Sequence, residues 1–235
     1  TESILPMLRI VEPEWLGTMP ADDPRAIRTR SDLVRINWVM QHRWIIQNTL
    51  RRALTAPRRI VELGAGDGTL MLRLARTLAK YWDPVCVVLV DRQPAVSKET
   101  VEAFSRLGWE VTTVTADVFD WLDRPEAGTC DVMLANLFLH HFKPPDLATL
   151  LALAAPRAQH FLACEPRRSR LALGLSHLVW LLGCGPVTYH DAVISVRAGF
   201  TGDELTALWP QNGWQLQERA IGPLTHFFYA RRIAL

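Results

Sequence analysis

The stretch RIVELGAGDGTL, residues 59–70, decides the fold of this chain. Residues 60–63 are apolar apart from Glu62 and predict a short buried strand. Gly64, Gly66 and Gly68 predict a tight turn, because glycine allows unusual backbone dihedrals and the close approach of a ligand. The apolar spacing of residues 69–81 predicts a helix. A strand, a glycine-rich turn and a helix N-terminus together direct free backbone N–H groups at a bound cofactor.

Composition sets the broad class. The chain has 235 residues, and 49% of them are hydrophobic, which is enough for a sizeable core. A formal net charge of +2 gives no argument for nucleic acid as a partner. The four cysteines form no C-x-x-C pair, which argues against zinc, and we expect no metal. Residues 1–10 do not resemble a secretory leader, and the apolar run 171–185 is too short to cross a bilayer. We therefore expect a cytoplasmic protein, and we leave a homodimer open.

The N-terminal part, residues 1–57, has helical character, and we expect it to form a helical cap. Asp22 and Asp23 before Pro24 predict one helix start. Ser31 and Asp32 predict the start of a second helical segment, which ends at residues 56–57. The arginines here are interpreted as a solvated helix surface rather than a nucleic-acid face; they are Arg25, Arg28, Arg30, Arg35, Arg43, Arg51 and Arg52.

From residue 58 the chain alternates strands and helices. Predicted strands cover residues 60–63, 85–91, 110–115, 130–135 and 160–164, and predicted helices cover 69–81, 98–107 and 145–155. This alternation indicates a doubly wound α/β fold with a mostly parallel sheet. Residues 214–220 and 225–231 predict two closing strands, which make seven in all, with an antiparallel strand at the C-terminal end. We expect residues 58–235 to form this domain.

Residues 167–200 are an insertion in this pattern. An apolar helix is predicted over residues 171–182, with a break at residues 183–186. This helix has two interpretations: a core helix with no further role, or the wall of a lid over an apolar substrate.

Each of the first three predicted strands has one acidic residue at its end or shortly after it. Glu62 lies two residues before the first glycine, where a carboxylate can anchor a cationic amino group. Asp91 ends the second strand, where an acid accepts hydrogen bonds from ribose hydroxyls. Asp117 follows the third strand, where it can bond an adenine amino group. The G-x-G-x-x-G fingerprint of dinucleotide-binding dehydrogenases would need its third glycine at position 69, where this chain has Thr69. A dehydrogenase is therefore the weaker alternative.

Together these motifs, VELGAGDGT, the Asp91 strand end, ADVF and ANLFLHHF, resemble the class I S-adenosylmethionine-dependent methyltransferases. The resemblance covers roughly residues 58–166 and the closing hairpin, and it implies a Rossmann-like fold and S-adenosylmethionine as cofactor. It also implies the residues that line the cofactor site, with Arg92 flanking the ribose or adenine; the others are Glu62, Gly64, Gly66, Asp91, Asp117, Val118 and Asn136.

The acceptor is less determined than the cofactor. Residues 136–139 read NLFL rather than the Asn/Asp-Pro-Pro-aromatic motif of methyltransferases that act on nucleic-acid bases. The segment is more similar to methyltransferases of quinones and polyketide-like secondary metabolites. We therefore expect O-methylation of a small apolar or aromatic metabolite, with His140 or His141 as general base. A packing role for this histidine pair is the alternative. Substrate-binding candidates are Trp38, Arg43, His190, Asp191, Ser195 and Arg197.

Three other functions remain open. The same histidines could serve C-methylation of a quinone-like ring. An RNA-binding methyltransferase would use the Arg-rich N-terminal part and would show a steep salt dependence. A methyltransferase-like fold kept as a cofactor sensor or binding module would bind the cofactor without turnover.

Overall fold

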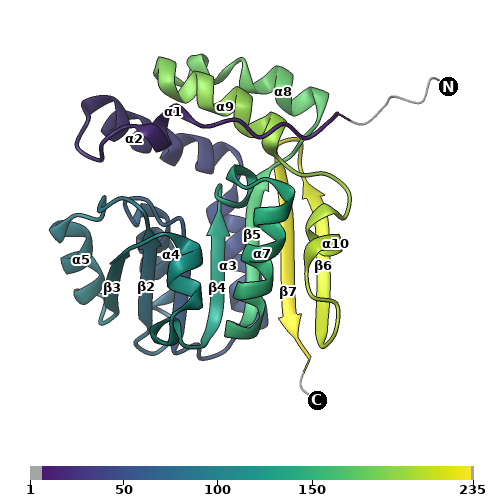
Figure 1. Ribbon diagram of the computed structural model, residues 1–235. Coiled ribbons are helices and arrows are strands. Elements are labelled where there is room, and N and C mark those ends of the chain that lie inside the picture. Colours follow the sequence, from purple (N-terminus) through teal and green to yellow (C-terminus); the bar gives the residue numbers. More distant parts are fainter. Residues whose placement is uncertain (1–6, 234–235) are drawn as a thin grey trace.

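The computed structural model describes residues 7–233, and its centre is a seven-stranded sheet in the order β3-β2-β1-β4-β5-β7-β6 (Figure 1). The strands β1 to β5 pair in parallel, whereas β7 runs antiparallel to both of its neighbours. This arrangement confirms the predicted mostly parallel sheet with an antiparallel C-terminal strand. The strands are β1 (Arg59–Leu63), β2 (Cys86–Asp91), β3 (Glu110–Thr115), β4 (Cys130–Asn136), β5 (Ala158–Pro166), β6 (Trp214–Ile221) and β7 (Thr225–Arg232).

Helices cover both faces of the sheet, as parallel strands with crossover helices require. One face packs against α3 (His42–Ala53), α4 (Thr69–Leu78) and α5 (Lys98–Ser105). The other packs against α6 (Val118–Asp123), α7 (Pro144–Ala154) and α10 (Glu204–Leu208). Short 3-10 turns η1 (Pro125–Ala127), η2 (Leu139–His141) and η3 (Ala155–Arg157) connect these elements. Helix α3 belongs to the N-terminal part of the chain, but its buried residues pack on a face of the sheet. The N-terminal helices before α3 cover the strand ends instead.

A separate group of helices lies across the carboxyl ends of the parallel strands (Figure 1). It consists of α1 (Trp15–Thr18), α2 (Pro24–Val39), α8 (Arg170–Ser176), η4 (Val179–Leu182) and α9 (Pro186–Ala198). Helix α9 packs against α8, α1 and α2. The N-terminal segment and the insertion, far apart in sequence, therefore build one roof over the edge of the sheet where the glycine turn lies.

The predicted helix start at Ser31 and Asp32 is wrong. Both residues lie inside α2, and the chain breaks instead at Gln41, whose φ is 59°. Asp32 is fully buried and accepts hydrogen bonds from the Gly185 backbone N–H at 2.8 Å and the Thr188 hydroxyl at 2.7 Å. The Asp32 carboxylate thus stabilises the N-terminus of α9 rather than a helix of its own.

The predicted apolar helix over residues 171–182 is shorter than expected, because α8 ends at Ser176 and η4 follows. The Ser176 hydroxyl donates to the Leu173 carbonyl at 2.8 Å, a bond that competes with continued helix. Trp180 and Leu181 are about 60% exposed, at 59% and 62%. This segment is therefore a surface wall and not a core helix.

Candidate active site

The glycine turn between β1 and α4 is tied to the end of β2. The backbone N–H groups of Gly64 and Ala65 donate to the Val90 carbonyl at 2.9 and 3.1 Å. The Gly66 N–H donates to Asp91 Oδ2 at 2.9 Å. Gly64 has a φ of 68°, and a Cβ there would lie 2.1 Å from the ring of Phe138. A Cβ on Gly66 would meet nothing within 4 Å, so the turn leaves open space at this point for a ligand.

Two buried polar atoms beside the turn have no hydrogen-bond partner among the described residues 7–233. They are Glu62 Oε2 and Asn136 Oδ1, and both residues line the same cavity. Burial raises the pKa of Glu62 well above its ordinary value, and the negative charges of Asp67 and Asp91 raise it further. Since buried acceptors are normally paired, the site is suited to a ligand that brings N–H donors and a positive charge. An α-ammonium group has this chemistry.

The remaining predicted cofactor residues surround the same space. Asp91 accepts from the Gly66 and Gln93 N–H groups, and each carboxylate oxygen keeps a further lone pair for a hydroxyl group. Asp117 caps α6 by accepting the Phe119 N–H at 2.9 Å, and Val118 is buried beside it. All eight predicted residues line one cavity of about 1390 Å³, namely Glu62, Gly64, Gly66, Asp91, Arg92, Asp117, Val118 and Asn136.

The cavity extends from the turn to the roof helices. Its far wall is largely apolar and is built from α2, α8 and η4, with lining residues that include Leu33, Ile36, Leu175, Val179 and Leu182. The predicted substrate residues Trp38 and Arg43 also line it, and the side chain of Trp38 is 77% exposed. A second ligand with an apolar body therefore has space beside the cofactor-like half.

His140 and His141 lie in η2, directly after β4, and both line the cavity. His140 is buried, and its Nδ1 lies 2.7 Å from Glu165 Oε2 while its Nε2 lies 3.1 Å from Glu14 Oε1. Burial disfavours the charged ring, but hydrogen bonds to the Glu14 and Glu165 carboxylates prevail and raise the pKa of His140 to about 9. His140 thus has no free ring nitrogen with which to accept a proton.

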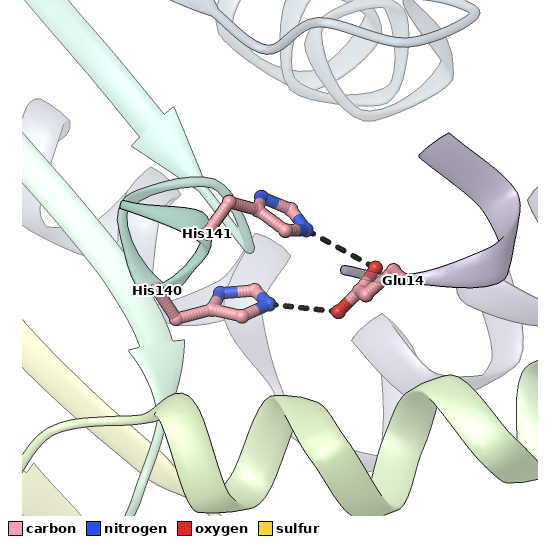
Figure 2. A group of neighbouring side chains, drawn as sticks. All are labelled: Glu14, His140 and His141. Atoms are coloured by element: carbon pink, nitrogen blue, oxygen red, sulfur yellow. Dashed lines mark hydrogen bonds and ion pairs between the residues drawn. The ribbon is translucent and has the colours of Figure 1, made fainter. Parts of the chain in front are cut away.

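His141 is the more exposed of the two, with 36% of its side chain accessible. Its Nδ1 donates to the Phe138 carbonyl at 3.0 Å, and its Nε2 lies 3.1 Å from Glu14 Oε2. Figure 2 shows Glu14 between the two rings, reaching from the segment before α1. We name Glu14, His140 and His141 the His–Glu cluster.

The four predicted substrate residues on α9 divide into two pairs. Asp191 and Ser195 line the cavity, whereas His190 and Arg197 do not. The Asp191 carboxylate binds the N-terminal segment, because it accepts hydrogen bonds from the Trp15 and Leu16 N–H groups at 2.9 and 3.0 Å. The rings of His190 and Trp15 are stacked with their centroids 3.8 Å apart. Helix α9 therefore holds the N-terminal segment in place.

Two residues of the site, Glu14 and Glu165, are missing from the sequence predictions. Glu165 is fully buried at the end of β5 and accepts the Phe138 and Leu139 N–H groups at 3.0 and 2.8 Å. It thereby fixes η2 as well as the ring of His140. Glu165 directly follows the predicted apolar strand 160–164, and this position was a signal for it, because Asp91 also stands at the end of an apolar strand. Glu14 lies 126 positions from His140 and has no such signal.

Comparison with known proteins supports this geometry. Residues 60–157 match a family model described as a methyltransferase domain. This part of the chain is thus similar to the methyltransferase domains of that family. The resemblance seen in the sequence is thereby confirmed, and the match covers β1 to α7, the elements around the glycine turn.

Relatives of known function share this domain. Trans-aconitate 2-methyltransferase of Mycobacterium tuberculosis is 34% identical over 90 residues, which are 38% of this chain and 30% of that protein. The chain thus matches less than a third of the length of this curated relative.

Solved structures share the whole fold. An O-methyltransferase family protein from Burkholderia thailandensis has a TM-score of 0.63 at 18% identity, over 92% of this chain and 62% of its own. The plantazolicin methyltransferase BpumL in complex with S-adenosylhomocysteine (SAH) has a TM-score of 0.60 at 14% identity, over 90% and 91% of the two chains. A methyltransferase of this fold is thus solved with SAH, which is the product form of the cofactor expected from the sequence. Among residues 7–233, no helix has the length and apolar character needed to cross a membrane.

Proposed function

We propose that this chain transfers the methyl group of S-adenosylmethionine to a nucleophilic oxygen of a small acceptor with an apolar body. The observation that carries the proposal is the single cavity that joins the glycine turn to the apolar roof, with the His–Glu cluster on its wall. S-adenosylmethionine supplies a methyl group on a positively charged sulfur, which leaves as a neutral thioether when the oxygen–carbon bond forms.

The cofactor half of the cavity binds and orients. Glu62 and Asn136 offer unpaired acceptors for the ammonium group of the cofactor. Asp91 and Asp117 are placed to accept from its ribose and adenine, and Val118 to pack on the base. Gly66 leaves the space into which this ligand fits. Holding the methyl donor in this way reduces the entropy cost of alignment with the acceptor.

The acceptor half excludes water and activates oxygen. The apolar wall of α2, α8 and η4 covers the acceptor, with Trp38 and Arg43 at its rim. Asp191 acts through the N-terminal segment, because its carboxylate is occupied by that backbone. The His–Glu cluster contains two imidazole rings, a type of side chain that can act as a general base, and His141 is the more accessible of the two. We assign activation of the acceptor oxygen to this cluster.

The relatives do not name the acceptor. The family match stops at residue 157, so it omits α8, η4, α9 and the segment with Glu14. Trans-aconitate is a carboxylic acid, and a carboxylate oxygen is therefore included with phenols and alcohols in the acceptor class to be tested. C-methylation of a quinone-like ring remains the runner-up, since the same cavity would hold that ring.

The proposal is tested with radiolabelled S-adenosylmethionine and a panel of phenols, hydroxylated polyketides and carboxylic acids. We expect label in an acid-stable product for at least one oxygen acceptor, and saturable cofactor binding in titration calorimetry. Absence of cofactor binding would refute the proposal. Label at carbon only, seen in the product by NMR, would favour the runner-up. Binding of RNA that weakens steeply with salt would instead favour the Arg-rich N-terminal part as an RNA site.

A further inference from the structure

The His–Glu cluster has the donor atoms of a metal site. One ligand atom from each of Glu14, His140 and His141 lies within 4.8 Å of the other two. Each ring presents its Nε2 to a carboxylate oxygen of Glu14 at 3.1 Å. Two ligands held about 2.1 Å from one ion at a right angle are about 3.0 Å apart, so this spacing suits a shared ion. All three residues line the cavity, which gives an ion access from solvent.

The outer contacts of both rings are those that metal-binding histidines make. His140 donates its Nδ1–H to the buried carboxylate of Glu165 at 2.7 Å. His141 donates its Nδ1–H to the backbone carbonyl of Phe138 at 3.0 Å. A ring whose Nδ1–H is bound to a carboxylate or a carbonyl turns its Nε2 lone pair toward a metal in a fixed direction. Both rings therefore turn their Nε2 atoms toward the carboxylate of Glu14 (Figure 2).

We propose that Glu14, His140 and His141 bind one divalent first-row transition metal ion at the acceptor end of the cavity. Two imidazoles and one carboxylate suit Zn²⁺ or Fe²⁺, whereas Mg²⁺ and Ca²⁺ prefer sites made of oxygen alone. Glu14 faces the two histidines from the opposite side (Figure 2), and an ion held by three protein ligands keeps at least one further coordination position for an acceptor. Cysteine spacing gave no indication of this site, because its ligands are histidines and a glutamate from distant parts of the chain.

Such an ion gives the acceptor a defined chemistry, a consequence that rests on the proposed function. A divalent ion held there would lower the pKa of a hydroxyl oxygen bound to it, so that the acceptor could lose its proton to solvent near neutral pH. Acceptors with two neighbouring oxygens would use two of the open positions. The ion would thus be the part of the His–Glu cluster that stabilises the deprotonated acceptor, and Glu165 would act as a positioning residue for His140.

The test measures binding before turnover. The full chain is treated with a chelator, and Zn²⁺ or Co²⁺ is titrated without cofactor, by calorimetry and by the visible spectrum of Co²⁺. We expect one ion per chain. Glu14→Gln and His141→Gln should each weaken binding at least tenfold, and Mg²⁺ should compete poorly. The matched control is His177→Gln on the surface, which should bind as the wild type does, since His177 contacts only the Tyr189 hydroxyl through its ring.

Circular dichroism establishes that each variant is folded, and the two ligands nearest the surface, Glu14 and His141, keep the test valid if His140→Gln does not fold. No stoichiometric ion in the wild type would overturn the proposal, as would equal affinity in the ligand variants and the control. Labelled methyl transfer with and without chelator is scored separately. Ion binding without transfer refutes the proposed function alone, and transfer without ion binding refutes the metal site alone.

Discussion

Replacing Glu62 by Gln should affect cofactor affinity and protein stability in opposite directions. In the part of the chain that the structure describes, Glu62 Oε2 is buried without a partner. Burial raises the pKa of the Glu62 carboxyl well above its ordinary value, and the negative charges of Asp67 and Asp91 raise it further. A folded-state pKa above the unfolded value means that ionisation opposes folding. Stability is therefore greatest below the unfolded pKa of Glu and declines as the pH rises toward the folded pKa. The Gln variant lacks this decline.

The same change removes the charge that would pair with the ammonium group of the cofactor. A hydrogen bond to a charged group contributes about 1.5–3 kcal/mol, which corresponds to roughly a 10- to 150-fold change in the dissociation constant. Titration calorimetry with SAH, which keeps the ammonium group, should show this loss in the variant. Thermal unfolding without ligand at pH 8 should show a higher Tm than the wild type. Glu126→Gln, on the exposed η1 turn, is the matched control and should change neither quantity.

Unchanged SAH affinity in the Glu62 variant would refute the assignment of Glu62 to the ammonium group. A lower Tm than the wild type would refute the argument that the buried charge opposes folding, because it would show that the carboxylate has a partner that stabilises it. The two measurements are independent, so each part of the reasoning fails by itself.

Other positions give further predictions. Gly64→Ala should lower the free energy of unfolding by about 2–4 kcal/mol, because the new Cβ would lie 2.1 Å from the Phe138 ring and the backbone is left-handed. A Cβ at Gly222 would meet nothing within 4 Å, so Gly222→Ala should cost only the backbone strain. Urea unfolding measures both variants. Burial lowers the pKa of His42 to about 4, so the unfolded chain binds a proton at this residue before the folded chain does as the pH falls below 6.5. The free energy of unfolding of the wild type should therefore fall by about 2 kcal/mol more than that of His42→Gln between pH 8 and pH 5. Asp191→Asn should speed tryptic cleavage within the N-terminal segment, with little change in Tm, because the amide binds the two backbone N–H groups less strongly; equal cleavage rates would contradict the role of α9 as its anchor.

The sequence predicted the parts of this molecule whose signals are local. Strand β1, the glycine turn and Asp91 are read from neighbouring residues and their spacing, and Glu62, Gly64, Gly66 and Asp91 line one cavity. Ser31 and Asp32 misled because the capping chemistry of Asp32 is real but serves α9, more than 150 residues away. Local pattern cannot tell which helix a capping side chain serves.

The acceptor end was harder to predict for a related reason. The pair of histidines was visible in the sequence, but its chemistry depends on Glu14 and Glu165, which meet it only in the folded chain. A histidine enclosed by two carboxylates and a histidine open to solvent have the same sequence pattern. Spatial partners, and not residue type, decide that His140 is enclosed by Glu14 and Glu165 while His141 is the more exposed ring.

The N-terminal segment lies across the cavity and carries Glu14, and this has a thermodynamic consequence. The side chain of Arg9 donates to the carbonyls of Ala198 at 2.7 Å and Phe142 at 2.9 Å, so polar contacts attach the segment both to α9 and to the loop after η2. Only molecules in the docked population possess a complete His–Glu cluster. The apparent affinity for anything bound there equals the intrinsic affinity multiplied by the docked fraction. Substitutions in this segment will thus change the apparent affinity for the acceptor by changing the docked fraction, even where the substituted residue contacts neither the acceptor nor the cofactor.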